Sequence, residues 1–106
     1  MAKERHKNIP AAYLFLLRGD QVLLLRRFNT GYADGQYSVV AGHVESGETF
    51  TQCILREAEE EVGARIRPEN IRVGHVMHKN SDSKEIEERV HVFFVAEQWE
   101  EGIENK

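Results

Sequence analysis

The segment from Phe50 to Val62 is the one long stretch of this sequence with helical periodicity. Thr49 and Gln52 have the spacing of a capping box at its start, and Gly63 stands where a left-handed residue would end it. When the segment is wound as an α-helix, one face carries an apolar stripe that we expect to face the core. The stripe consists of Phe50, Cys53, Ile54, Ala58 and Val62.

Carboxylates fall inside this apolar stripe. Glu57 and Glu61 lie within it and Glu60 lies on its shoulder, whereas Gln52, Arg56 and Glu59 face outward. Like charges four residues apart repel by a few tenths of a kcal/mol, and burial adds a desolvation cost. A bound cation would neutralise the cluster, and oxygen ligands favour magnesium or manganese over calcium. The alternative, judged on the helix alone, is an acidic helix whose charged face points into solvent.

The remaining apolar runs predict strands. Arg18-Gly19-Asp20 is a turn signal that would join two of them in a hairpin. Five strands and one helix indicate a mixed α/β or α+β domain, with loops over 29–36 and 80–87. The expected strands are Ala11–Leu17, Gln21–Arg27, Tyr37–Ala41, Ile71–Met77 and Val90–Glu97.

Size, charge and cysteine content narrow the class of protein. A chain of 106 residues makes one domain, and its net charge of −4 argues against binding a nucleic-acid polymer or an anionic membrane. The longest apolar run, Ala11–Leu17, is too short to cross a bilayer. The single cysteine, Cys53, excludes an internal disulfide and favours a reducing, cytoplasmic setting.

The stretch 42–64 resembles the Nudix box, the signature of the Nudix hydrolases. The box has a glycine, five residues, a glutamate, seven residues, and then Arg-Glu-aliphatic-x-Glu-Glu-x-Gly-aliphatic. The matching positions are Gly42, Glu48, Arg56, Glu57, Ala58, Glu60, Glu61, Gly63 and Ala64. The flanking strands are similar to the sheet of a MutT-like domain.

The resemblance implies a single Nudix domain over residues 1–106, of the α+β class, in which a mixed sheet lies inside an α/β/α sandwich. Such domains continue through a further strand and a C-terminal helix, both of which are missing from this sequence. One face of the sheet is therefore expected to lack a covering layer, and a homodimer is one way to cover it.

The resemblance also implies an activity. Nudix enzymes use a metal-activated water to hydrolyse the diphosphate bond of a nucleoside diphosphate linked to another group, with Mg²⁺ or Mn²⁺ as cofactor. A nucleoside triphosphate is the first expectation for the substrate because the layout is short and MutT-like. An ADP-ribose or dinucleotide pyrophosphatase is the alternative among enzymes. A binding module that keeps the fold with little activity is a third hypothesis, disfavoured because a binder has no reason to keep repelling carboxylates.

Site residues follow from the match to the box. The implied metal ligands are the main-chain carbonyl of Gly42 and the carboxylates of Glu57, Glu60 and Glu61. Glu57 is also a candidate general base. Arg56 is expected to hold the catalytic glutamates in place, and Glu48 to support them.

Substrate contacts are expected from residues next to the box. Arg26 and Arg27 are candidates for phosphate contacts, with ordinary solvation of a strand end as the alternative. His43 lies inside the loop of the box and could approach a substrate. His91 is expected to be structural, and Cys53 to act as a small hydrophobe.

Overall fold

A computed structural model describes residues 7–26, 37–80 and 88–100 of the chain, without the side chains of Arg26 and Tyr37. Its long helix, α1, spans Phe50–Val62 as expected. Thr49 and Gln52 form the capping box, and Gly63 ends the helix at φ 72° in the left-handed region that favours glycine. No helix in the described ranges is long and apolar enough to cross a membrane.

The strands are more numerous and, in part, shorter than the sequence suggested. A short 3-10 helix, η1 (Pro68–Asn70), precedes the sixth of them. The strands are β1 (Ile9–Arg18), β2 (Gln21–Val22), β3 (Leu25–Arg26), β4 (Tyr37–Ser38), β5 (Val40–His43), β6 (Ile71–Lys79) and β7 (Arg89–Ala96).

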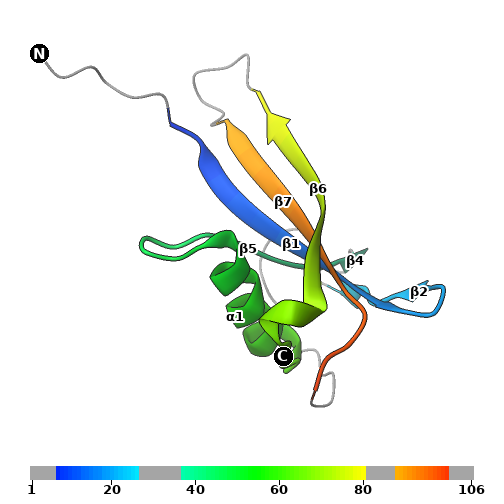
Figure 1. Ribbon diagram of the computed structural model, residues 1–106. Coiled ribbons are helices and arrows are strands. Elements are labelled where there is room, and N and C mark those ends of the chain that lie inside the picture. Colours follow the sequence, from blue (N-terminus) through cyan, green and yellow to red (C-terminus); the bar gives the residue numbers. More distant parts are fainter. Residues whose placement is uncertain (1–6, 27–36, 81–87, 101–106) are drawn as a thin grey trace, which may run out of the picture.

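The main sheet is mixed, as the resemblance implied, and β1 is its centre. Along one edge β1 pairs with β7 in parallel, and β7 pairs in turn with β6 in antiparallel register. The other edge of β1 is divided between two partners: β5 takes Ala11–Leu14 and β2 takes Leu17–Arg18, both antiparallel. Figure 1 shows α1 under this sheet, next to β5.

This division of the β1 edge explains why the expected hairpin is broken. The prediction of one continuous strand over Gln21–Arg27 is wrong, because β5 already occupies the part of β1 along which that strand would continue. The amide of Leu23 still donates to the Leu16 carbonyl at 2.9 Å; the chain then leaves the main sheet, and β3 pairs with β4 in a separate two-stranded sheet. The expected strand Tyr37–Ala41 is likewise divided between β4 and β5.

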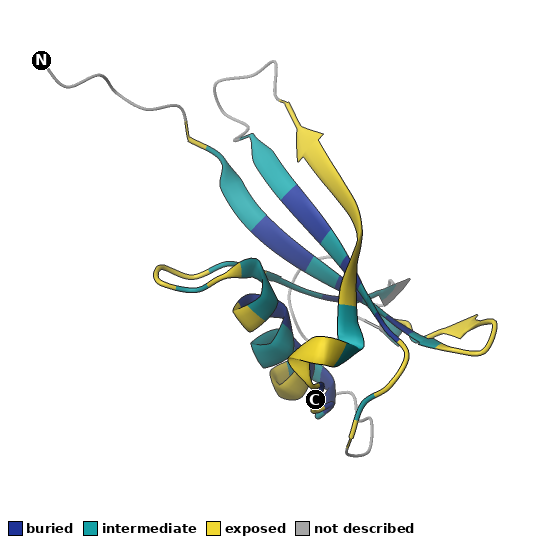
Figure 2. Cartoon of the chain, viewed as in Figure 1, coloured by how far each residue is buried: buried dark blue, intermediate teal, exposed yellow. Residues whose placement is uncertain are grey.

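The core lies between α1 and one face of the main sheet (Figure 2). Most of the predicted apolar stripe of α1 is buried, with Cys53, Ile54, Ala58 and Val62 fully enclosed, whereas Phe50 is only partly buried against the core. Alternate residues of the two central strands meet it, so the sheet register decides which side chains enter the core. They are Ala12, Leu14 and Leu16 on β1, and Val92, Phe94 and Ala96 on β7.

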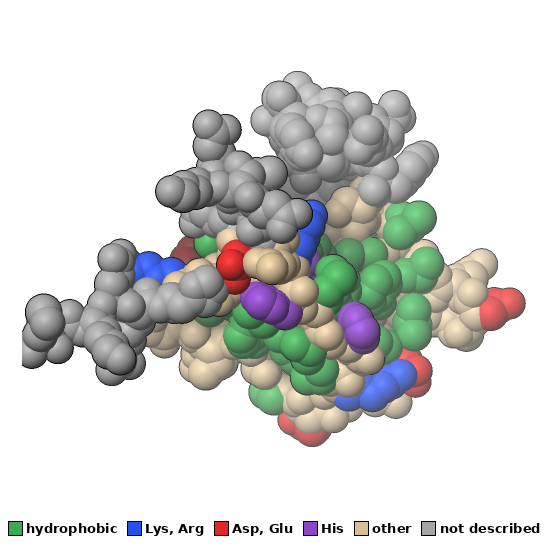
Figure 3. All heavy atoms as spheres, turned by 90° about the horizontal axis from the view of Figure 1, so that it is seen from above, with side chains coloured by type: hydrophobic (Ala, Val, Ile, Leu, Met, Phe, Trp, Pro, Cys, Tyr) green, Lys and Arg blue, Asp and Glu red, His purple; other side chains and the backbone are tan. Residues whose placement is uncertain are grey.

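The opposite face of the sheet, here called the outer face, is also apolar. Tyr13 and Phe93 stack there at 4.9 Å, and His91 lies 4.9 Å from the ring of Tyr13. Part of this face forms an open hollow, and Figure 3 shows hydrophobic side chains and histidines together on the surface. The hollow is lined by Phe15, Gly74, His75, Met77, Phe93 and Val95.

Candidate active site

The site begins where α1 meets the free edge of β5. The backbone amide of Ala41 points away from β1 and donates a hydrogen bond of 3.2 Å to Oε2 of Glu61. Two turns earlier on the helix, the thiol of Cys53 donates to the carbonyl oxygen of His43, with an S···O distance of 3.5 Å. Side chains of the helix thus satisfy backbone groups of β5 that no neighbouring strand pairs with.

Gly42 lies between these two contacts, and its lack of a side chain makes room for Glu57. A Cβ built on Gly42 would overlap the Cγ and carboxyl group of Glu57. The side chain of Glu57 is only 16% exposed, so the carboxylate is held against the β5 backbone. This is a packing requirement and not a conformational one, since the φ of Gly42 is not positive.

Arg56 ties the acidic residues together. Its Nε and Nη2 donate to the two carboxylate oxygens of Glu48 at 2.8 and 3.0 Å. Its Nη1 donates to Oε1 of Glu57 at 2.6 Å and to Oε2 of Glu60 at 3.2 Å. The hydrogen bonds from Arg56 hold the pKa of Glu48 at about 2 and raise that of the Arg56 guanidinium, so this pair stays charged over the physiological range.

Glu61 is in a different electrostatic state. Burial, together with the neighbouring carboxylates of Glu57 and Glu60, raises the pKa of its carboxyl group to about 7, against the opposing effect of the hydrogen bond from the Ala41 amide. Glu57 and Glu61 therefore form a pair of carboxylates that disfavours two negative charges. This is the arrangement that a divalent cation would stabilise.

The residues present fit a magnesium-type ion in part. Glu57 and Glu61 bring hard oxygen ligands to adjacent residues of β5, whereas Glu60 is 59% exposed and held to the side by Arg56. Within the described ranges, no group of three or more potential ligand side chains is close enough to hold a metal alone. Magnesium commonly takes one or two carboxylates and completes its shell with water and substrate phosphates, so the two carboxylates of Glu57 and Glu61 are a suitable donor set.

The structure separates His43 from the carboxylates. In the β1–β5 register His43 lies opposite Ala11 and Gly42 opposite Ala12, so the two residues point to opposite faces of the sheet. Gly42 faces α1, whereas His43 is exposed on the outer face. Of the two candidate phosphate ligands, Arg26 lies on β3 with its side chain outside the described part, and Arg27 lies outside the described residues.

Two features of the site were not found by sequence reasoning. The pairing of Arg56 with the glutamates of the box was expected, but its burial was not. Its side chain, expected on the outward side of the helix, is only 26% exposed because four glutamates hold it against the helix and its preceding loop. The hydrogen bonds from Cys53 and the Ala41 amide were also missed, because the docking of α1 on β5 has no local sequence signal.

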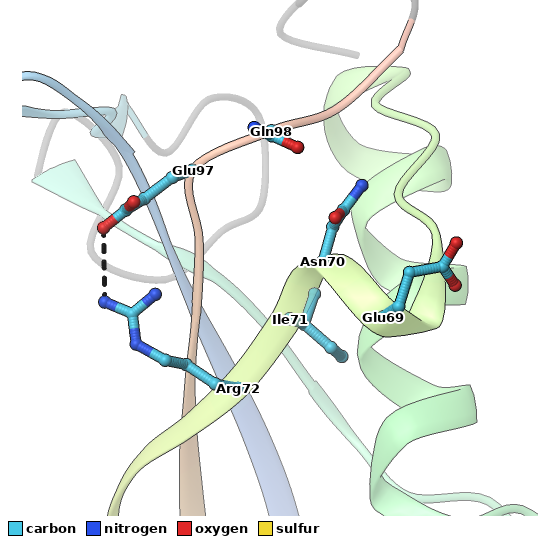
Figure 4. Close-up of a pocket in the computed structure, with 6 residues that line it drawn as sticks. All are labelled: Glu69, Asn70, Ile71, Arg72, Glu97 and Gln98. Atoms are coloured by element: carbon cyan, nitrogen blue, oxygen red, sulfur yellow. Dashed lines mark hydrogen bonds and ion pairs between the residues drawn. The ribbon is translucent and has the colours of Figure 1, made fainter.

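A second, polar hollow lies at the C-terminal end of β7, and none of its lining residues belongs to α1 or β5 (Figure 4). An ion pair of 3.2 Å between Arg72 and Glu97 closes one side of it. The amide side chains of Asn70 and Gln98 face its interior. Its charged side chains are already paired in part, and nothing links it to the carboxylates of α1.

A mixed sheet that packs a glutamate-rich helix against a glycine-containing strand defines an α+β domain with an acidic strand–helix site. The chain belongs to the NUDIX domain family, whose match covers residues 7–106. The fold is the Nudix fold, as the box predicted.

Solved structures with the same fold include members of the MutT/nudix family. A MutT/nudix family protein from Enterococcus faecalis superposes with a TM-score of 0.80 at 24% identity, over 99% of this chain and 42% of that one. A MutT NUDIX hydrolase from Burkholderia pseudomallei gives 0.78 at 19% identity, over 94% of this chain and 74% of that one. These likenesses establish the fold alone.

Among curated proteins, the NAD-capped RNA hydrolase NudC of Stutzerimonas stutzeri (strain A1501) is 46% identical over 59 residues. That alignment covers 56% of this chain and 21% of the relative. The chain therefore spans about a fifth of the length of this relative.

Proposed function

We propose that this chain is a divalent-metal-dependent pyrophosphohydrolase of nucleotides. The observation that carries the proposal is the pairing of Glu57 and Glu61 against β5, next to Gly42. Two carboxylates in this position repel each other, and burial has already raised the pKa of Glu61 to about 7. A fold without a cation to bind would gain stability by replacing one of them.

Each residue of the box has a role in this mechanism. A divalent cation, when bound, supplies positive charge that neutralises phosphate oxygens and makes a water molecule more acidic. Glu57 and Glu61 would provide its protein ligands. Glu60 and the Gly42 carbonyl, which the box also implies, are less well placed, because Arg56 holds Glu60 to the side and the Gly42 carbonyl faces β1. Arg56 holds the Glu57 carboxylate in one orientation, and Glu48 holds Arg56.

The chemical step is hydrolysis of a phosphoanhydride. The oxygen of a water molecule attacks one phosphorus, the bond from that phosphorus to the bridging oxygen breaks, and the second phosphate leaves with the bridging oxygen. Glu57 is our candidate to accept the proton of the attacking water. Arg26, Arg27 and His43 were the expected substrate contacts; the placement of His43 on the outer face makes it the weakest of these three proposals.

A nucleoside triphosphate remains our first candidate substrate, with a MutT-like fold in its support. A dinucleotide is the second candidate, and it is favoured by one specific observation: the 46% identity to a relative whose name describes hydrolysis of NAD-capped RNA. Both candidates contain the phosphoanhydride that the box would act on. The expectation that no nucleic-acid polymer is bound stays a prediction.

A substrate panel tests the proposal. Purified chain with Mg²⁺ or Mn²⁺ is given nucleoside triphosphates, ADP-ribose, NAD and a short NAD-capped RNA, and the products are identified by mass spectrometry. Glu57→Gln should lower turnover by orders of magnitude. The matched control is Glu59→Gln, which removes an exposed carboxylate from the same helix and should leave turnover unchanged.

The outcomes separate the hypotheses. Cleavage of triphosphates alone supports the first candidate, and cleavage of NAD or ADP-ribose supports the second. Turnover of NAD-capped RNA with little turnover of free NAD would contradict our view that no polymer is bound. Nucleotide binding without turnover of any substrate would identify a binding module and overturn the proposal.

A further inference from the structure

Cys53, on α1, is fully buried against β5, the strand that carries the box glycine. Its Sγ lies 3.5 Å from the carbonyl oxygen of His43 and 3.8 Å from that of Gly42. On its other side, Nη2 of Arg56 lies 3.9 Å from the same sulfur. The thiol is therefore in contact both with the backbone of β5 and with the arginine that orients Glu57.

From these contacts we infer that Cys53 is a positioning residue, which fixes the Gly42–His43 backbone of β5 against α1 and so holds the Glu57 carboxylate in place for a cation. The inference rests on the proposed metal-dependent function. It does not require the thiol to touch metal or substrate, and it assigns no redox or nucleophilic role to a side chain that solvent does not reach.

The geometry explains why a small displacement here would matter. The Cα of Gly42 is so close to Glu57 that even a Cβ would overlap the carboxyl group. Any shift of β5 toward the helix therefore moves Glu57, and any shift away from the helix removes the backbone against which the Glu57 carboxyl group is held. The S–H···O bond is weak, but it satisfies a His43 carbonyl that points away from β1. Its loss would leave that carbonyl without this partner.

The test compares three variants for metal affinity and for stability. Cys53→Ala removes the sulfur and its hydrogen bond, whereas Cys53→Ser keeps a donor in the same place. Ile54→Val is the matched control, because Ile54 is equally buried at the next position of α1 and its side chain has no group that could donate to a β5 carbonyl. Mn²⁺ affinity is measured by calorimetry, stability by thermal melting, and the Gly42 and His43 amide resonances by NMR without metal.

We expect Cys53→Ala to weaken Mn²⁺ binding about tenfold, as is typical when a residue supporting a metal ligand is removed. It should also shift the Gly42 and His43 amide resonances. Cys53→Ser should recover most of the affinity, and Ile54→Val should lower the melting temperature while keeping the affinity of the parent.

Equal Mn²⁺ affinity in the parent and Cys53→Ala would overturn the inference while leaving the proposed function intact. A similar loss in Ile54→Val would overturn it too, because it would show that any cavity in α1 has the same effect. Failure of the parent itself to bind Mn²⁺ would refute the metal-dependent function, and the role of Cys53 with it.

Discussion

The carboxyl group of Glu57 occupies the space above Gly42 in which any other residue would place its Cβ. Gly42→Ala should therefore displace either β5 or Glu57, with loss of metal binding and turnover. Overpacking of this kind typically costs about 1–3 kcal/mol of stability. Metal affinity by calorimetry and the free energy of unfolding in urea measure the two effects.

A glycine of the turn between β5 and α1 provides the control for that substitution. Gly47 has a φ of +80°, and a Cβ placed on it would meet open space within 4 Å, so Gly47→Asn tests the turn without the clash. Its metal affinity should equal that of the parent. If Gly42→Ala binds metal as well as Gly47→Asn does, then the contact between Gly42 and Glu57 has no part in the site.

Glu61 should make the metal-free protein less stable as the pH rises. Its pKa in the folded state, about 7, lies above the ordinary value of 4.5, so the folded state binds a proton more tightly than the unfolded chain. The stabilising contribution is complete below pH 4.5 and is lost as the pH rises through about 7. Urea unfolding in EDTA across this range measures it.

The variant Glu61→Gln should remove this pH dependence, because an amide does not titrate. The difference in unfolding free energy between the variant and the parent should then change between pH 5 and pH 8 in favour of the variant. A difference that is constant across that interval would contradict the raised pKa.

Arg56→Lys should damage the site although it keeps the charge. The guanidinium donates to both oxygens of Glu48 and to Glu57 at the same time, and an ammonium group cannot reproduce this fork. Steady-state kinetics with saturating metal should show turnover reduced by about one to three orders of magnitude, with a smaller effect on stability. The control is Arg72→Lys, which alters an exposed ion pair remote from α1. Equal turnover in both variants would show that the fork is not needed.

The outer face of the sheet should make the chain associate. Met77 is 39% exposed on β6 and belongs to an apolar hollow with Phe93 and Val95, so this face exposes apolar area that association would bury. Size exclusion with light scattering at micromolar concentration should show dimers, exchanged species or aggregates. Met77→Lys should shift the population toward the monomer.

Val22→Lys is the control for that substitution, since Val22 is 42% exposed on β2 and lies outside the hollow. It should leave the association unchanged. A single monomeric peak of the parent chain, with a sharp cooperative melt, would refute the prediction of a homodimer or other assembly.

Local signals made α1 predictable, and non-local competition made the strands less so. The bounds of the helix follow from Thr49, Gln52 and Gly63, which act within one turn of its ends. The end of the β1–β2 pairing depends on β5, which comes later in the chain and occupies the same edge of β1. No pattern within Gln21–Arg27 could reveal that competitor.

The site was predictable where the spacing of the box is decisive. The burial of Glu57 and the ion pairs of Arg56 follow from residues on one helix and its preceding loop. The placement of His43 required the register between β5 and β1, in which a shift of one residue exchanges the faces of the sheet. The same register leaves the backbone amide of Ala41 free to donate a hydrogen bond to Glu61, and no side-chain pattern encodes this contact.

The parallel pairing of β1 with β7 has a consequence for how the chain reaches its native state. Ile9 pairs with Arg89 and Leu16 with Ala96, so the central ladder joins the first described strand to the last. During synthesis β1 leaves the ribosome long before its partner exists, and one whole edge of it stays open until β7 follows. Loop-closure entropy must also be overcome before this ladder forms, which makes folding slow relative to a domain built on local contacts. Until β7 is made, the nascent chain therefore exposes an unpaired, apolar strand, which is prone to aggregation.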